Sequence, residues 1–197
     1  DAHRIPAGST VVLHSPGGSL LGGLKLGHAI RANGLNTEIG RANGTEIGSA
    51  AGECYSACAL AFLGGRFRWT QEASRYGVHR FYSTGGKPAD ADLAQMMSSV
   101  IVSYLQEMEI DPALLAEMSF TSSQDMNVIP LARQRALNVV NDGQAPTVWT
   151  LESGGGVIYL KGQRDTFRGV NKFMLLCVGG QQLNLYTVFD AEGHLVA

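Results

Sequence analysis

The stretch that decides the fold of this chain is CYSACALAFLGG, at residues 54–65. Between Ser56 and Leu63 the side chains are small or apolar, which is the composition of a helix that is buried on all of its faces. Gly64 and Gly65 follow, and glycines of this kind are typical of a helix end. The sequence therefore predicts a short buried helix that begins at Ser56.

Strands and helices alternate on both sides of this stretch. The β-branched and apolar run at residues 10–13 predicts a strand, and leucines at helical spacing in residues 20–30 predict a helix that ends at Asn33-Gly34. Such alternation is typical of the α/β class. After residue 65 we expect strands at 66–70 and 76–82, and helices at 88–107, 111–118 and 130–140.

Two short patterns occur twice in this part of the chain. RANG occupies residues 31–34 and 41–44, and TEIG occupies residues 37–40 and 45–48. A short insertion is the simplest origin, because stacked repeat folds need at least about three units. We expect the second copy to form a loop or an extended edge.

The pattern changes after Asn141-Asp142-Gly143. From there the sequence alternates between apolar and polar residues in runs separated by glycine-rich turns, which predicts strands only. The expected strands are 148–151, 157–160, 173–178 and 183–189. We therefore expect an α/β domain at residues 1–142 and a small antiparallel β module at residues 143–197.

Composition excludes several classes of function. With 45% hydrophobic and 16% charged residues in 197, the chain has ample material for a buried core. A net charge of −2 without a run of Lys or Arg implies neither nucleic acid nor anionic lipid as a partner. The apolar runs are far shorter than the roughly 20 residues of a membrane span. Three cysteines without paired spacing do not predict a zinc site, and no metal or cofactor is expected.

Three places carry residue types that hydrolytic chemistry uses, and each also has an ordinary structural explanation. The turn Ser15-Pro16-Gly17-Gly18 can present a backbone N–H to an oxyanion or can be a plain turn. Ser56 can be a nucleophile beside the N–H of Ala57, or an N-cap. His79 can be a general base or a histidine satisfied within the core. Taken singly, the residues leave both explanations open.

The order of these segments resembles that of the proteolytic subunit of Clp protease (ClpP), within the wider crotonase-like superfamily. Ser15-Pro16-Gly17-Gly18 followed by a Leu- and Gly-rich helix is similar to that family's oxyanion strand and helix. Residues 54–59 resemble its nucleophile segment, and Gly77-Val78-His79 resembles its histidine strand. The resemblance covers about residues 11–140. It is greatest to secreted or periplasmic Clp-like proteins with a Cys-x-Ser-x-Cys segment.

This resemblance implies a ClpP/crotonase-like β-α-β superhelical core and a serine peptidase that acts on peptides or proteins. Ser56 would be the nucleophile and His79 the base, with the N–H groups of Gly18 and Ala57 as the oxyanion hole. A homo-oligomer is implied as well. So is a periplasmic or secreted location, with the cytoplasm as the alternative.

Asp125 is the expected third member of a Ser-His-Asp triad. The family's aspartate follows the long helix and a short capped helix, just before a final helix rich in alanine. Asp125 stands at that place, after the helix expected at 111–118 and before the one expected at 130–140. The alternative is a solvated aspartate in a surface turn.

The chain also departs from the family. Cysteines replace small residues on both sides of Ser56, strands expected before Thr10 are missing, and the β module at 143–197 has no counterpart in the Clp subunit. These differences put barrel assembly in doubt, and we infer no ATPase partner. A catalytically inactive binding or assembly protein and a crotonase-type acyl thioester enzyme remain as alternative functions.

Cys54 and Cys58 lie close enough in sequence to pair. Disulfide geometry requires their Cα atoms to be about 4.4 to 6.8 Å apart, which is met if Cys54 lies just outside the helix. A bridge would fit an oxidising compartment, whereas buried free cysteines fit any compartment. The sequence leaves both states open.

Overall fold

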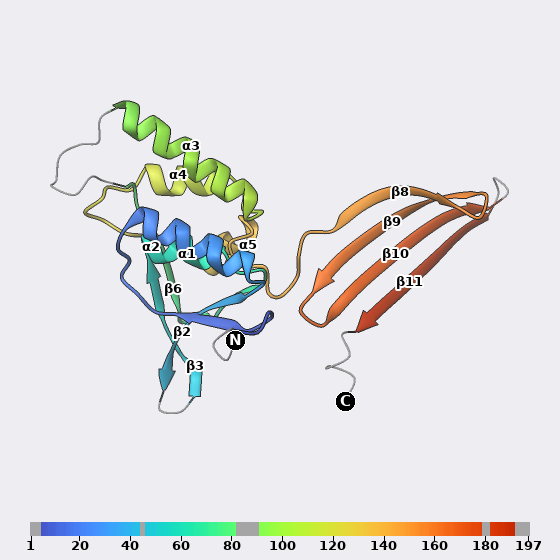
Figure 1. Cartoon of the computed structure of the whole chain (residues 1–197), viewed down its shortest axis with the longest axis horizontal. Coiled ribbons are helices and arrows are strands. Elements are labelled where there is room, and N and C mark those ends of the chain that lie inside the picture. The colour runs from blue at the N-terminus through green and yellow to red at the C-terminus, as the bar shows by residue number, and fades with distance from the viewer. Residues whose placement is uncertain (1–4, 44–45, 82–90, 179–181, 192–197) are drawn as a thin grey trace. The chain divides into compact units, whose positions relative to one another are not determined.

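The computed structural model describes residues 5–43, 46–81, 91–178 and 182–191 (Figure 1). The chain divides into two compact units, Asp1–Asp142 and Gly143–Ala197. The first unit mixes helices and strands, and the described part of the second contains strands. The two units are described separately.

The first unit contains two sheets and five helices in its described residues. One sheet has the order β1-β2-β3, with β5 also paired to β2, and the other has the order β4-β6-β7. Pairings β1–β2, β2–β5 and β4–β6 are parallel, as expected of strands joined through helices. The strands are β1 (Thr10–Leu13), β2 (Asn36–Asn43), β3 (Glu46–Ala51), β4 (Glu53–Tyr55), β5 (Arg68–Thr70), β6 (Arg75–Val78) and β7 (Asn127–Val128). The helices are α1 (Leu20–Ala32), α2 (Ala57–Leu63), α3 (Ala91–Glu107), α4 (Ala113–Ser119) and α5 (Leu131–Ala136).

Helix α2 is the centre of the core of this unit. Every residue of this helix is buried, so the buried helix expected from Ser56 onward is confirmed. Figure 1 shows α1, α3 and α4 gathered on one side of the strands together with α2. The Tyr104 hydroxyl of α3 donates a hydrogen bond to the Leu60 carbonyl at 2.6 Å. Burial raises the pKa of Tyr104, which keeps this donor protonated.

Two glycines let α1 pack directly against its neighbours. A Cβ at Gly23 would overlap the carbonyl oxygen of Ala57, and a Cβ at Gly27 would overlap the Tyr104 hydroxyl. Any larger residue would push α1 away from the start of α2. Because α1 follows directly on the Ser15–Gly18 turn, this close approach holds the turn near Ser56.

A buried arginine joins the end of α2 to the last segment of the unit. Arg68 is 1% exposed, and its guanidinium donates to three backbone carbonyls. The acceptors are Val139 at 2.9 Å, Gly65 at 2.7 Å and Asn138 at 2.8 Å. Burial lowers the pKa of Arg68 to about 9, so the group stays charged at neutral pH.

The histidine strand is shorter than predicted. We expected a strand at 76–82, but β6 ends at Val78, so His79 follows the strand instead of lying within it. The reason is its antiparallel neighbour β7, which pairs only with Gly77 and Val78. Residue 82, the expected end of this strand, and residue 88, the expected start of the next helix, lie outside the described residues.

Two further segments refine the predictions. The helix expected at 130–140 ends at Ala136, because Asn138 adopts a φ of 56° that leaves the helical region. The second copy of the short repeat forms an extended edge, since its residues belong to the end of β2 and to β3, which pair antiparallel. Residues 44 and 45 of that copy lie outside the described residues.

The second unit is one antiparallel sheet with the order β11-β10-β9-β8. Its strands are β8 (Val148–Gly154), β9 (Val157–Thr166), β10 (Gly169–Val178) and β11 (Gln182–Ala191), and each is longer than predicted. Leu151, Leu160, Leu175 and Leu185 are paired in one row across all four strands, so they share a face. Within residues 143–177 and 182–189, whose exposure is described, only glycines are buried.

Candidate active site

Ser56 lies at the junction between β4 and α2 in an unusual backbone conformation. Its φ is 57° and its ψ is −120°, a region that residues with a side chain rarely adopt. Its N–H donates to the carbonyl of Gly77 at 2.9 Å, which ties the junction to the histidine strand. Ser56 occupies the N-cap position of α2, yet its side chain makes no capping hydrogen bond. The N-cap explanation therefore does not account for this serine.

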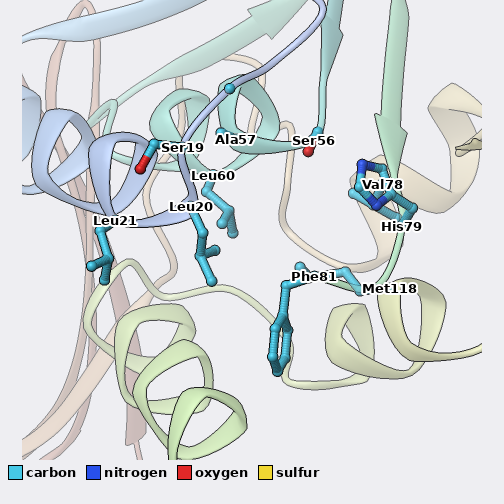
Figure 2. Close-up of a pocket in the computed structure, with 11 residues that line it drawn as sticks. Ser19, Leu20, Leu21, Ser56, Ala57, Leu60, Val78, His79, Phe81 and Met118 are labelled. Carbon is cyan, nitrogen blue, oxygen red and sulfur yellow. The ribbon is translucent and has the colours of Figure 1, made fainter. Parts of the chain in front are cut away.

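Ser56 opens onto a cavity of about 340 Å³ that also receives His79. Figure 2 shows Ser56 at the start of α2 and His79 after β6, with the apolar side chains of Leu20, Leu60 and Phe81 around the same space. The structure thus brings four of the predicted site residues to one cavity. The lining residues are Gly18, Ser19, Leu20, Leu21, Ser56, Ala57, Leu60, Val78, His79, Phe81 and Met118.

The glycine turn is fastened to the strand that carries the nucleophile candidate. Ser15 donates its N–H to Glu53 at 2.8 Å and accepts the N–H of Tyr55 at 3.1 Å. Gly17 lies so close to Ser56 that a Cβ on it would be 2.8 Å from the Ser56 Cβ. Sequence reasoning singled out Gly18 and missed this packing role of Gly17. The Gly-Gly pair was the available signal, but it does not tell which glycine faces the serine.

The imidazole of His79 is held by a backbone group. Its Nδ1 lies 2.7 Å from the carbonyl oxygen of Arg80, and Arg80 is itself anchored through its N–H to Thr121 at 3.1 Å. A carbonyl can only accept, so Nδ1 donates in this contact, and in the neutral imidazole Nε2 is then the nitrogen without a proton. That is the tautomer that a general base requires.

Asp125 lies in the segment between α4 and β7 and is exposed. Its N–H donates to the Ser122 carbonyl at 3.1 Å, as in a turn. Asp125 does not line the cavity that Ser56 and His79 share. The structure therefore brings Ser56 and His79 to one cavity, but not Asp125.

A disulfide joins Cys54 to Cys58 and encloses Ser56, with the two Cα atoms 5.2 Å apart. Cys54 belongs to β4 and so lies outside the helix, whereas Cys58 is in the first turn of α2. Cys177 is a free, exposed thiol. In the described part of the chain, no group of three or more His, Cys, Asp or Glu side chains is arranged to hold a metal ion.

No family model matches the chain, and no curated protein matches it. Among solved structures, the chain is similar to a mutant of the membrane-bound stomatin-specific protease 1510-N in complex with a substrate peptide. The TM-score is 0.49 at 16% sequence identity, and the similarity covers 68% of this chain and 59% of that protein. The function must therefore be inferred from the site itself. Of the helices that the structure describes, none is long and apolar enough to cross a membrane.

Proposed function

We propose that the chain is a serine hydrolase, and specifically a peptidase, with Ser56 as nucleophile and His79 as general base. The observation that carries this proposal is the backbone conformation of Ser56. Ser56 has a φ of 57°, and its side chain makes no capping hydrogen bond to α2. Ser56 instead lines a cavity that His79 also lines. Strained residues of this kind cluster at active sites, where the surrounding structure maintains them.

In the proposed reaction, the Ser56 hydroxyl oxygen bonds to the substrate carbonyl carbon while its proton passes to Nε2 of His79. The N–H groups of Gly18 and Ala57, which both line the cavity, stabilise the charge that develops on the carbonyl oxygen. His79 then returns the proton to the leaving amine as the C–N bond breaks. Water hydrolyses the resulting acyl-enzyme by the same route.

The carbonyl of Arg80 supplies the orientation that a carboxylate gives in a Ser-His-Asp triad. At 2.7 Å it fixes the ring and the tautomer of His79. We therefore propose a Ser56–His79 dyad held by a backbone carbonyl. A triad completed by Asp125, as the family resemblance implies, is the alternative, and substitution of Asp125 distinguishes the two.

The shape of the cavity supports a peptide with an apolar side chain next to the bond that is cleaved. Below the serine, the cavity is walled by hydrophobic residues, and apolar walls bind apolar groups by removing them from water. The residues concerned are Leu20, Leu60, Val78, Phe81 and Met118.

The proposal is tested with a fluorophosphonate probe, which reacts with activated serines. We expect the wild-type protein to gain one probe, mapped by mass spectrometry to Ser56, and Ser56→Ala to gain none. Ser19→Ala is the matched control, because Ser19 lines the same cavity but its hydroxyl caps α1 by accepting the N–H of Gly22 at 3.3 Å. A folded wild-type protein that remains unlabelled would contradict the proposal and favour a non-catalytic binding role.

Gly17→Ala is expected to slow this labelling roughly a hundredfold, because a misplacement of about 1 Å at a catalytic site has an effect of that size. The new Cβ would meet the Ser56 Cβ at 2.8 Å and force the serine to move. Gly8→Ala is the control that separates the effect of this steric clash from the effect of placing alanine at a positive φ. Gly8 also has a positive φ, of 82°, but a Cβ there meets nothing within 4 Å. Equal labelling rates in the two variants would count against contact between Gly17 and the nucleophile.

The unit Gly143–Ala197 is proposed to support assembly or partner binding without contributing to the chemistry. It contains none of the residues to which we assign a catalytic role. A protein truncated after Asp142 should therefore retain probe labelling of Ser56 at close to the wild-type rate. Loss of labelling in a truncated protein whose helical circular dichroism is intact would show that the second unit takes part.

The Cys54–Cys58 disulfide supports a periplasmic or secreted location, since disulfides persist in oxidising compartments and are rare in the cytosol. We also propose that the protein forms a homo-oligomer, because the family that its sequence resembles does so.

A further inference from the structure

We propose that the Cys54–Cys58 disulfide is a positioning element for the nucleophile, which keeps Ser56 in the conformation that presents its hydroxyl to the cavity. The inference rests on the proposed role of Ser56 as nucleophile. It assigns a role to two residues that do not themselves touch the substrate.

The first step is the path of the chain between the two cysteines. Four residues of extended chain span about 13 Å. The Cα atoms of Cys54 and Cys58 are only 5.2 Å apart, so the chain must turn between them. The residue with a positive φ in this interval is Ser56. The disulfide therefore closes a loop across the one strained residue of the junction.

The second step is that Ser56 has a relaxed alternative. A serine at a helix start normally has a negative φ and accepts the N–H of the second or third helical residue, here Cys58 or Ala59. In that conformation the hydroxyl oxygen is directed at the first turn of α2 instead of at the cavity that His79 lines. The observed conformation is the opposite one, with a φ of 57° and no capping hydrogen bond. The two conformations give the same serine two exclusive roles.

The third step is that both ends of the bridge are firmly held. Cys54 is 0% exposed and pairs with Tyr76 in β6 on one side and with Ser15 on the other. Cys58 is 7% exposed and belongs to the hydrophobic core. Rotation of Ser56 to a negative φ would shift the start of α2 relative to β4. A bridge that holds the two Cα atoms within the narrow range of a disulfide opposes that shift.

The experiment compares two proteins that both carry Cys177→Ser, so that no other thiol interferes. One retains the disulfide, and the other carries Cys54→Ala and Cys58→Ala. We expect the second protein to react with the fluorophosphonate about ten- to a hundredfold more slowly. We also expect its kcat to fall with little change in KM, because the cavity walls are untouched. Crystal structures should show Ser56 with a negative φ and its hydroxyl bound to a helix N–H.

The outcomes separate this inference from the proposed function. If the disulfide-bonded protein is labelled at Ser56 and the alanine variant reacts within threefold of its rate, the positioning role is overturned and the hydrolase remains. If neither protein is labelled, the proposed function fails. In that case the crystal structures still test whether the disulfide controls the conformation of Ser56. A positive φ of Ser56 in both proteins would show that it does not.

A second comparison applies if the alanine variant does not fold. The Cys177→Ser protein is reduced with a phosphine under native conditions, and its two thiols are counted by mass after alkylation of a denatured sample. Reduction changes no side-chain volume, so a drop in the labelling rate reports the loss of the covalent link. An unchanged rate in the reduced and folded protein would overturn the proposal.

Discussion

Replacement of His79 by glutamine is expected to lower kcat/KM for a peptide substrate by about a thousandfold or more, whereas Asp125→Asn should stay within about threefold of wild type. The first effect follows from the loss of the general base, which contributes up to about four orders of magnitude. The small effect of Asp125→Asn follows from the structure, in which the Arg80 carbonyl oxygen lies 2.7 Å from Nδ1 of His79. We expect that no carboxylate is required, because the backbone carbonyl fixes the tautomer.

The measurement is steady-state hydrolysis of a peptide with an apolar residue before the scissile bond. His28→Gln serves as the matched control, because His28 is an exposed histidine on α1 that pairs with Glu107 at 3.2 Å. A loss in Asp125→Asn as large as that in His79→Gln would mean that the carboxylate reaches His79 in the substrate complex. The dyad would then give way to the Ser-His-Asp triad.

The largest expected effect on stability comes from Arg68→Met, which should lower the free energy of unfolding by about 3 to 5 kcal/mol. The substitution leaves three buried carbonyls, those of Gly65, Asn138 and Val139, without their donor. Methionine fills much of the space, so the loss comes chiefly from the unpaired acceptors and less from a cavity. A loss of this size is a large fraction of the total stability of an ordinary domain.

Urea denaturation followed by helical circular dichroism measures this effect, because the helices that the structure describes belong to the first unit. The free energy of unfolding of Arg68→Lys should lie between those of Arg68→Met and wild type. A single ammonium group cannot reach all three carbonyls that converge on the planar guanidinium. The control is Arg66→Met, at an exposed position in the same segment, which should change stability by less than about 1 kcal/mol. A methionine variant at position 68 as stable as wild type would refute the role given to this arginine.

Elements with a strong local pattern could be predicted from the sequence, and elements formed by distant pairing could not. Helix α2 was predictable because its small and apolar residues have no other place than the core. Strand β4 was missed, because Glu53–Tyr55 has no alternating pattern and becomes a strand only by pairing with β6. The end of β6 at Val78 is likewise set by β7, about fifty residues further along the chain.

The same distinction applies to the candidate site. Ser56 and His79 have side chains that a family resemblance can identify, and the structure brings both to one cavity. The carbonyl of Arg80 is a backbone group, and every residue has one, so no sequence pattern could have pointed to it. Arg68 is a similar case, because a charged residue is ordinarily expected at the surface. Its burial depends on the carbonyls of Asn138 and Val139, about seventy residues further along the chain, together with that of the nearby Gly65.

The single-layer sheet of the second unit has a consequence for calorimetry. Unfolding raises the heat capacity of a protein mainly by bringing apolar surface into contact with water. In this sheet, leucines of the shared row are already exposed, Leu151 to 74% and Leu185 to 56%. Melting the sheet therefore adds little new hydration. The heat-capacity increment of the whole chain should fall below the roughly 12–15 cal/mol/K per residue typical of globular proteins, with most of it arising from the first unit.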